Sequence, residues 1–182
     1  MHIKIDLVQP EFSRPIALEK IPPSGMEQTL EAKENERKAL AERFGLLELL
    51  KLEAKITLHP ARADQAIAVT GSLIADVVQQ CVITLDPLPS HIEHSFKVFY
   101  AAPELLEGGA GPSDPNEEDF EPIIEGVIDL GELVAQNLGI MLDPYPRKEG
   151  VGYIEAGFGE EKSVPGPLAQ LANWPKNPKK TK

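Results

Sequence analysis

Three stretches of this chain alternate apolar and polar side chains with a period of two, and no other feature constrains its fold as strongly. Such alternation is typical of β-strands that bury one face. Short turns, such as Asp86–Ser90, join the stretches, so they predict an antiparallel β-meander. The alternation is less regular from Val77 or Val78, which indicates a change of register, and it leaves open whether the sheet closes into a barrel. The apolar series are Leu50, Leu52, Ala54, Ile56 and Leu58; Ile67, Val69, Gly71, Leu73 and Ala75; and Ile92, His94, Phe96, Val98 and Tyr100.

Two helices are expected beside this meander. The first covers residues 29–45, with Thr29 as a candidate N-cap and Gly45 as a stop signal. Charged residues dominate it, so it should lie outside with one face docked. The second follows Asp129, which forms a capping-box-like pair with Glu132, and ends before Pro144. It should pack on the meander through Leu130, Leu133, Val134, Leu138, Met141 and Leu142, since each buried side chain contributes about 1.5–3 kcal/mol.

The predicted class is therefore α+β: an antiparallel meander with a flanking N-terminal helix and a packed C-terminal helix. Short strands are also expected at Ile3–Leu7, Pro15–Glu19 and Ile123–Ile128. With 182 residues, 42% of them hydrophobic, the chain can build one core, so residues 1–172 are predicted to form a single domain. The segment 103–121 should be a flexible acidic loop, and residues 173–182 a flexible basic tail.

The net charge of −11 bears on the kind of partner that this chain binds. It repels polyanions such as RNA unless cations gather on one face, and it attracts basic proteins. No run of about 18 apolar residues and no secretory signal occurs, so we expect a soluble protein of the cytoplasm. The single cysteine, Cys81, rules out an internal disulfide.

No catalytic motif is found in the sequence. It has no phosphate-binding loop, no strand-linked GxGxxG and no GxSxG. His91 and His94 are three residues apart, which places them on opposite faces of a strand and disfavours a metal site. Cys81 lies in an apolar alternation and is expected to be a small core residue. We therefore expect a protein that is not an enzyme and holds no metal, cofactor or small-molecule substrate.

Candidate binding residues follow the second helix. In DPYPRK, two prolines extend the chain and display Tyr145, Arg147 and Lys148, which form either a recognition loop or a solvated helix stop. Trp174 is either a docked anchor or a partner contact. The basic tail is either a solvated end or an RNA contact through Lys176, Lys179, Lys180 and Lys182.

Several motifs resemble those of the YceD family, the large ribosomal RNA subunit accumulation proteins. They are Val69–Leu73, Gln79–Leu88, Phe96–Phe99, Ile128–Leu138 and Asp143–Arg147, and the resemblance covers most of residues 25–172. Residues 41–45 and 167–172 look like the alphaproteobacterial branch. Membership implies a role in synthesis, processing or stability of large-subunit (23S) rRNA, hence in ribosome assembly, and no catalytic activity. Some members carry further cysteines that look like a zinc site; because Cys81 is alone here, the resemblance implies no metal for this chain.

Three hypotheses result. The leading one is a non-enzymatic factor that binds a basic ribosomal protein or assembly factor of the large subunit, with rRNA contact indirect or limited to the tail. The second is direct rRNA binding through Arg147, Lys148 and the tail. The third is an RNA-processing nuclease, which needs converging carboxylates or histidines that we cannot name in this sequence.

Overall fold

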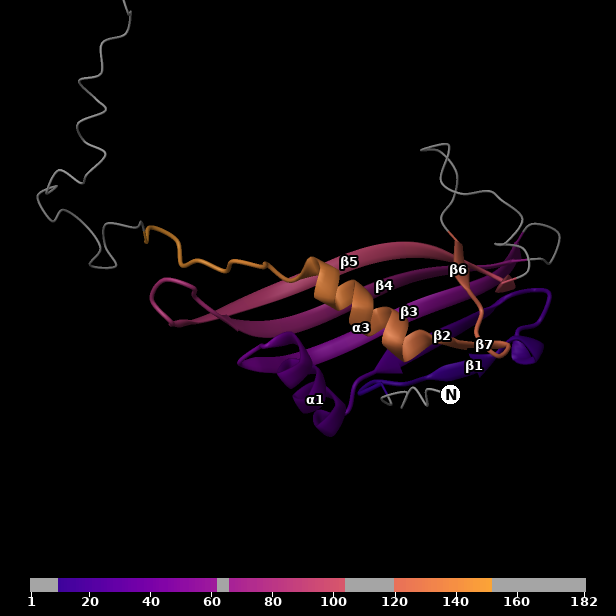
Figure 1. The fold of residues 1–182 in the computed structure, drawn as a ribbon, viewed down its shortest axis with the longest axis horizontal. Coiled ribbons are helices and arrows are strands. Elements are labelled where there is room, and N and C mark those ends of the chain that lie inside the picture. Colours follow the sequence, from indigo (N-terminus) through magenta and orange to yellow (C-terminus); the bar gives the residue numbers. More distant parts are fainter. Residues whose placement is uncertain (1–9, 62–65, 104–119, 152–182) are drawn as a thin grey trace, which may run out of the picture.

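The computed structural model describes residues 10–61, 66–103 and 120–151. A five-stranded sheet has the strand order β2-β3-β4-β5-β6, and a second sheet pairs β1 with β7 (Figure 1). The strands are β1 (Pro15–Ala17), β2 (Met26–Glu31), β3 (Glu48–Ala61), β4 (Ala66–Gln80), β5 (Pro87–Ala101), β6 (Phe120–Pro122) and β7 (Val127–Asp129). The helices are the 3-10 turn η1 (Leu18–Lys20), α1 (Glu34–Phe44) and α3 (Leu130–Met141).

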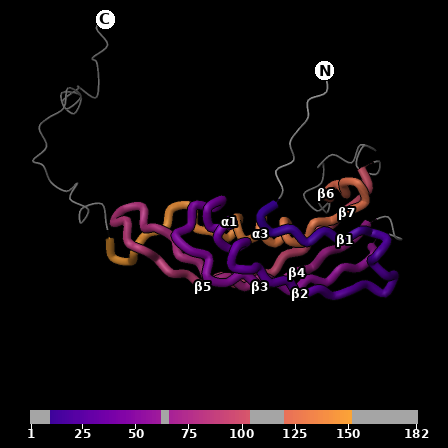
Figure 2. Tube along the Cα trace, turned by 90° about the horizontal axis from the view of Figure 1, so that it is seen from below, coloured from indigo at the N-terminus to yellow at the C-terminus, as the bar shows by residue number. Residues whose placement is uncertain are grey.

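The described elements form two layers. Figure 2 shows the five-stranded sheet edge-on, with α1, α3 and the β1–β7 pair on the same side of it. The other face of the sheet has no described element over it. An antiparallel sheet can adopt this arrangement because its strands alternate between a core face and a solvent face. The observed class is therefore α+β with an open meander, as predicted, and the described strands do not close into a barrel.

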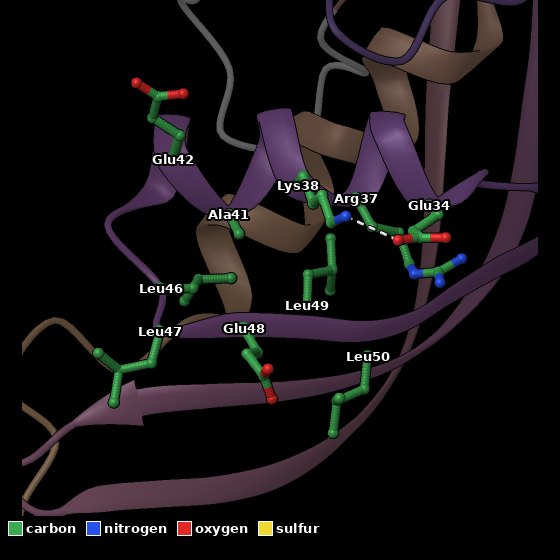
Figure 3. Close-up of a pocket in the computed structure, with 10 residues that line it drawn as sticks. All are labelled: Glu34, Arg37, Lys38, Ala41, Glu42, Leu46, Leu47, Glu48, Leu49 and Leu50. Atoms are coloured by element: carbon green, nitrogen blue, oxygen red, sulfur yellow. Dashed lines mark hydrogen bonds and ion pairs between the residues drawn. The ribbon is translucent and has the colours of Figure 1, made fainter.

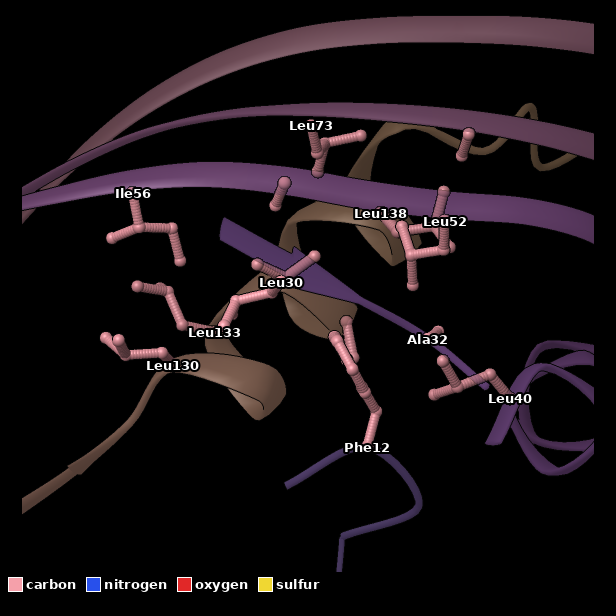
Figure 4. Close-up of a cluster of buried hydrophobic side chains, with 14 of the residues drawn as sticks. Phe12, Leu30, Ala32, Leu40, Leu52, Ile56, Leu73, Leu130, Leu133 and Leu138 are labelled. Carbon is pink, nitrogen blue, oxygen red and sulfur yellow. The ribbon is translucent and has the colours of Figure 1, made fainter. Parts of the chain in front are cut away.

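The alternation seen in the sequence is the burial pattern of the sheet. Leu52 pairs with Ala75, and Ala75 pairs with Ile92, so one buried row crosses three strands. Phe12 and the buried side chains of α1 and α3 cover this face. Figure 4 shows the resulting core around Phe12, Leu30, Ala32, Leu40, Leu52, Ile56, Leu73, Leu130, Leu133 and Leu138.

The start of the first helix was predicted wrongly. Thr29 is not an N-cap: it lies in β2 and pairs with Lys55. Leu30, in β2, is buried in the core, and this burial outweighs the helical propensity of the segment. The helix begins five residues later, at Glu34, where the Lys33 backbone N–H donates to Glu36 Oε2 at 2.7 Å. Its predicted stop is confirmed, since Gly45 has a φ of 65°.

The turn between β4 and β5 also differs from the prediction. It occupies residues 81–86 instead of 86–90, and β5 begins at Pro87. Pro87 and Pro89 fit there because, among the described strands, this end of β5 pairs with β4 alone, and so half of its N–H groups have no acceptor strand. The expected register change exists, but it lies in β3, between Leu49 and Lys51, rather than in β4.

Only the end of the strand predicted at 123–128 is confirmed: β7 begins at Val127, and Glu125 and Gly126, both with positive φ, form a turn before it, while β6 ends at Pro122, before the predicted range. β6 pairs with β5 in parallel, the exception to the antiparallel meander. The strand expected at 15–19 ends at Ala17 and continues as η1. Residues 3–7 and 104–119 lie outside the described residues, so that strand and the flexibility of the acidic loop stay predictions. The division of the chain into one domain and a basic tail also stays a prediction.

The N-cap of α3 is confirmed and its first turn is corrected. Asp129 Oδ1 accepts from the N–H groups of Gly131 (3.0 Å) and Glu132 (3.2 Å). Glu132 does not complete a capping box: its carboxylate accepts from Arg43 instead. Met141, expected in the buried stripe, is 40% exposed at the end of the helix. No helix among the described residues is long and apolar enough to cross a membrane.

Candidate partner-binding surface

The segment after α3 is held against the β4–β5 turn by its backbone. Gln79 Nε2 donates to the Asp143 carbonyl at 2.9 Å, and the Val82 N–H donates to the Pro146 carbonyl at 2.9 Å. The Asp143 carboxylate accepts from the Tyr145 N–H at 2.8 Å and shapes the turn between the two prolines. These contacts give the segment a defined path along the turn, which a solvated helix stop does not require.

Cys81 joins the turn to this segment. Its side chain is buried, as expected, and its Sγ accepts from the backbone N–H groups of Thr84 (3.5 Å) and Lys148 (3.4 Å). The hydrogen bonds from Thr84 lower the pKa of the Cys81 thiol to about 6, and the Lys148 N–H contributes in the same direction. In this position the sulfur acts as a hydrogen-bond acceptor that fixes the local backbone.

The structure brings together three of the predicted binding residues and places them on the surface. The Tyr145 side chain is 69% exposed, and Arg147 and Lys148 are exposed as well. Lys148 Nζ pairs with Asp86 at 2.9 Å, which raises the pKa of Lys148 and lowers that of Asp86. The other predicted contacts lie outside the described residues; they are Trp174, Lys176, Lys179, Lys180 and Lys182.

Exposed apolar side chains gather at the same end of the molecule, and the sequence analysis did not identify them. Of the ten large hydrophobic residues exposed in the described chain, seven lie at the α1–β3 connection, the β4–β5 turn or the end of α3. These three places lie at one end of the sheet in Figure 1. We call this surface the apolar end. It consists of Leu47, Leu50, Val82, Leu85, Ile140, Met141 and Tyr145.

Two backbone irregularities expose leucines at the apolar end. The β3 bulge between Leu49 and Lys51 inserts Leu50 as an extra residue and leaves its side chain 55% exposed. Leu85 adopts a φ of 62° in the β4–β5 turn, a left-handed conformation that residues other than glycine rarely adopt. In the sequence LLELL, leucines stand at both odd- and even-numbered positions, so both faces of a strand would carry leucine and the pattern does not reveal the bulge.

A hollow of about 590 Å³ lies between α1 and the start of β3 (Figure 3). Its volume is within the usual range of ligand pockets, about 300–1,000 Å³. Leucines from the α1–β3 connection and β3 line it together with charged residues of α1. The lining residues are Glu34, Arg37, Lys38, Ala41, Glu42, Leu46, Leu47, Glu48, Leu49 and Leu50.

The open face of the sheet has a different chemistry. A smaller hollow of about 460 Å³ there is lined for the most part by polar residues, and half of its lining residues are Thr or Ser, such as Thr57 and Ser72. His91 Nδ1 lies 2.6 Å from Asp76 Oδ1, and this carboxylate, followed by Glu93, raises the pKa of His91. His94 lies on the opposite face of β5 beside Phe96, as expected. Within residues 10–61, 66–103 and 120–151, no three His, Cys, Asp or Glu side chains are grouped so that they could hold a metal ion.

Comparison with known protein families finds a match for more than half of the chain. The family model described as "Large ribosomal RNA subunit accumulation protein YceD" matches residues 69–173, from within β4 to beyond the end of α3. No curated protein and no solved structure matches the chain. The matched region contains the β4–β5 turn, α3 and the segment from Asp143 to Lys148.

Proposed function

Because this chain belongs to the YceD family of large ribosomal RNA subunit accumulation proteins, we propose that it supports the synthesis, processing or stability of 23S rRNA by binding a protein partner in ribosome assembly. The family match, which spans more than half of the chain, carries the role in rRNA accumulation. The family description names accumulation of rRNA and no reaction, which agrees with a role that is not enzymatic.

The apolar end is the observation that supports a protein partner. Exposed apolar side chains that gather in one region of a protein surface, as these seven do, are a feature of interaction sites. The centres of interfaces are enriched in Tyr, Met and Arg, and Tyr145, Met141 and Arg147 all lie at or beside the apolar end. The hydrogen-bonded backbone of residues 143–148 preorganises Tyr145 and Arg147 and so reduces the entropy lost on binding.

The charge of the chain supports a basic partner. With a net charge of −11, the protein attracts the cationic proteins of the large subunit and repels free rRNA at long range. A ribosomal protein or an assembly factor of the large subunit fits this charge. The protein then acts in the cytoplasm, where these partners are found, and contacts rRNA indirectly or through its basic tail.

Affinity purification of the tagged protein, followed by mass spectrometry, tests the proposal. We expect a large-subunit ribosomal protein or assembly factor to co-purify, and Tyr145→Ala and Arg147→Ala to deplete it. Ile124→Ala is the matched control, because Ile124 is 69% exposed but lies away from the apolar end. An unchanged set of bound proteins in the Tyr145 and Arg147 variants would contradict this use of the segment.

Direct rRNA binding is the competing function, and it predicts a different result. In the described residues, Lys148 pairs with Asp86, which weakens this part of a basic patch. The test is binding of 23S rRNA fragments at several salt concentrations, with and without residues 173–182. Tight binding at physiological salt by the chain without its tail would favour direct RNA contact and overturn our proposal.

A further inference from the structure

Part of the lining of the hollow between α1 and β3 is apolar surface that the fold itself does not bury. Leu46 and Leu49 are buried in the core, whereas Leu47 and Leu50 are 47% and 55% exposed. Figure 3 shows Leu46 and Leu49 directed towards α1, and Leu47 and Leu50 on the strand side of the hollow, directed away from α1. Leu50 lies in this position because of the bulge, since a regular strand would have no extra residue there. Backbone bulges redirect side chains, and this one directs a leucine to the surface.

The charged residues around the hollow differ in whether they have partners. Lys38 Nζ pairs with Glu34 at 2.6 Å, and Arg37 donates to the Ala32 carbonyl at 2.7 Å, so both cations are engaged. Glu42 on α1 and Glu48 on β3 lie on opposite sides of the hollow (Figure 3), and no described residue pairs with their exposed carboxylates. The C-terminal end of α1 lies beside Glu42 and adds partial negative charge.

These observations define the chemistry of an occupant. Leu47 and Leu50 favour a large aliphatic side chain, because its burial removes apolar surface from water on both sides. Glu42 and Glu48 favour Lys or Arg beside that side chain, and they disfavour an acidic neighbour. A surface with these two properties selects a segment with both features and rejects a segment with only one.

We propose that this hollow binds a short segment of the basic partner protein, one that carries leucine or isoleucine flanked by Lys or Arg. This inference rests on the proposed function and deepens it, since it states where the partner docks and which residues it presents. Tyr145 and Arg147, in the segment that follows α3, then form a second contact with the same partner. Long-range attraction by the acidic chain brings the partner near, and the hollow selects the segment that docks.

Synthetic peptides test this inference on the full-length chain. The probe is the acetylated peptide GKKLLKKGG, and its controls are GKKSSKKGG, with the same charge, and GEELLEEGG, with the same leucines. We expect binding of the first peptide by calorimetry, and dissociation constants at least about tenfold higher for both controls. The serine control separates the hollow from simple attraction between a basic peptide and an acidic protein.

Substitutions in the protein locate the binding. Leu50→Ser should raise the dissociation constant of GKKLLKKGG by about tenfold, and Glu42→Gln with Glu48→Gln should raise it and flatten its salt dependence. Since these side chains are exposed, the variants should keep the melting temperature of the parent. Ile124 is 69% exposed and lies between β6 and β7, at the other end of the sheet in Figure 1, so Ile124→Ser should bind as the parent does.

Two results would overturn the inference: equal binding of GKKLLKKGG and GKKSSKKGG, or a Leu50→Ser variant that binds GKKLLKKGG as tightly as the parent. Either result leaves the proposed function standing if a large-subunit protein still co-purifies through Tyr145 and Arg147. Conversely, if the peptide binds at Leu50 but no ribosomal protein or assembly factor co-purifies, the hollow is a docking site and the proposed function is wrong.

Discussion

Leu85 shows at the level of one residue how backbone strain and surface exposure coincide at the apolar end. Its φ of 62° is in the left-handed region, which costs an L residue about 1–2 kcal/mol. Two backbone hydrogen bonds hold the turn, from the Leu85 N–H to the Cys81 carbonyl (3.0 Å) and from the Cys81 N–H to the Asp86 carbonyl (2.8 Å). The side chain is 65% exposed and adds little to the core, so we expect it to contribute to an external contact.

Replacing this leucine should therefore stabilise the protein and weaken its binding. Leu85→Asn is expected to raise the free energy of unfolding by about 0.5–1 kcal/mol, because asparagine tolerates the left-handed region. Chemical denaturation measures this change, and the affinity purification should show less partner. Ile140→Asn, which has a helical backbone, should bring no such gain. A loss of stability in Leu85→Asn would show that the leucine packs where we find it exposed.

Gly131 is a second residue whose identity the packing requires. A Cβ atom there would lie 2.3 Å from the Phe12 carbonyl oxygen, which belongs to the backbone and cannot rotate away. We expect Gly131→Ala to lower the free energy of unfolding by about 1–3 kcal/mol, despite the better helix propensity of alanine. Gln136→Ala, on the exposed side of α3, should change it by less than about 0.5 kcal/mol. Thermal denaturation of both variants makes the comparison, and a stabilised Gly131→Ala would contradict the close approach.

At the scale of elements, ion pairs fasten α1 and α3 to each other and to the N-terminal segment. Arg43 of α1 pairs with Glu132 of α3 at 2.8 Å and with Glu11 at 3.0 Å, and Arg14 pairs with Glu36 at 2.8 Å. The hydrogen bonds that Arg43 donates to the Glu132 carboxylate lower the pKa of Glu132 and raise the pKa of Arg43. These pairs position α1, and therefore the hollow, over the start of β3.

The Arg43–Glu132 pair predicts a dependence of stability on pH. A carboxyl group whose pKa is lower in the folded state stabilises the fold fully above its unfolded pKa, near 4.5, and loses that effect as pH falls through the folded value. Glu132→Gln should therefore cost about 0.5–1 kcal/mol at pH 7, and the difference from the parent should shrink below pH ~4.5. Urea denaturation at several pH values measures it. A difference that persists at pH 3 would contradict the assignment.

At the scale of the whole molecule, the described elements build a one-sided sheet, and in the binding that we propose its apolar end and its negative charge would act at different steps. Charge acts over about 10 Å in 0.1 M salt and affects encounter. Apolar contact acts only at touching distance and affects how long the complex lasts. A net charge of −11 together with a small apolar surface thus suits a partner that arrives by electrostatic attraction and is kept by a few side chains.

If charge affects encounter and apolar contact affects the lifetime of the complex, the two should change different rate constants for binding to the basic partner. The association rate should fall by about tenfold or more between 50 and 500 mM salt, because steering is screened. Leu50→Ser should instead raise the dissociation rate and leave the association rate nearly unchanged. Surface plasmon resonance with the purified partner separates the two rates. An association rate that does not depend on salt would remove the role we assign to the acidic charge.

The sequence alone was sufficient to determine the meander, the α+β class and the capped start of α3. These features depend on local patterns: the period of two in β3–β5, and Asp129 before an apolar stripe. The sequence also singled out Tyr145, Arg147 and Lys148, because two prolines around an aromatic residue form an unusual local signal. The structure places these three side chains on the surface beside the β4–β5 turn, and their role in binding stays a prediction.

Only the tertiary structure decided where α1 begins, which leucine of LLELL is exposed, and that the exposed apolar residues share one end of the molecule. Thr29 belongs to a strand because β3 offers it a partner, and Leu50 is exposed because a bulge in β3 shifts its register against β4. A period-two pattern allows two assignments for each strand residue, one to the buried face of the sheet and one to the exposed face. Which alternative is realised depends on elements distant in sequence, such as β4 opposite Leu50 and α1 beside it, and no local pattern contains that information.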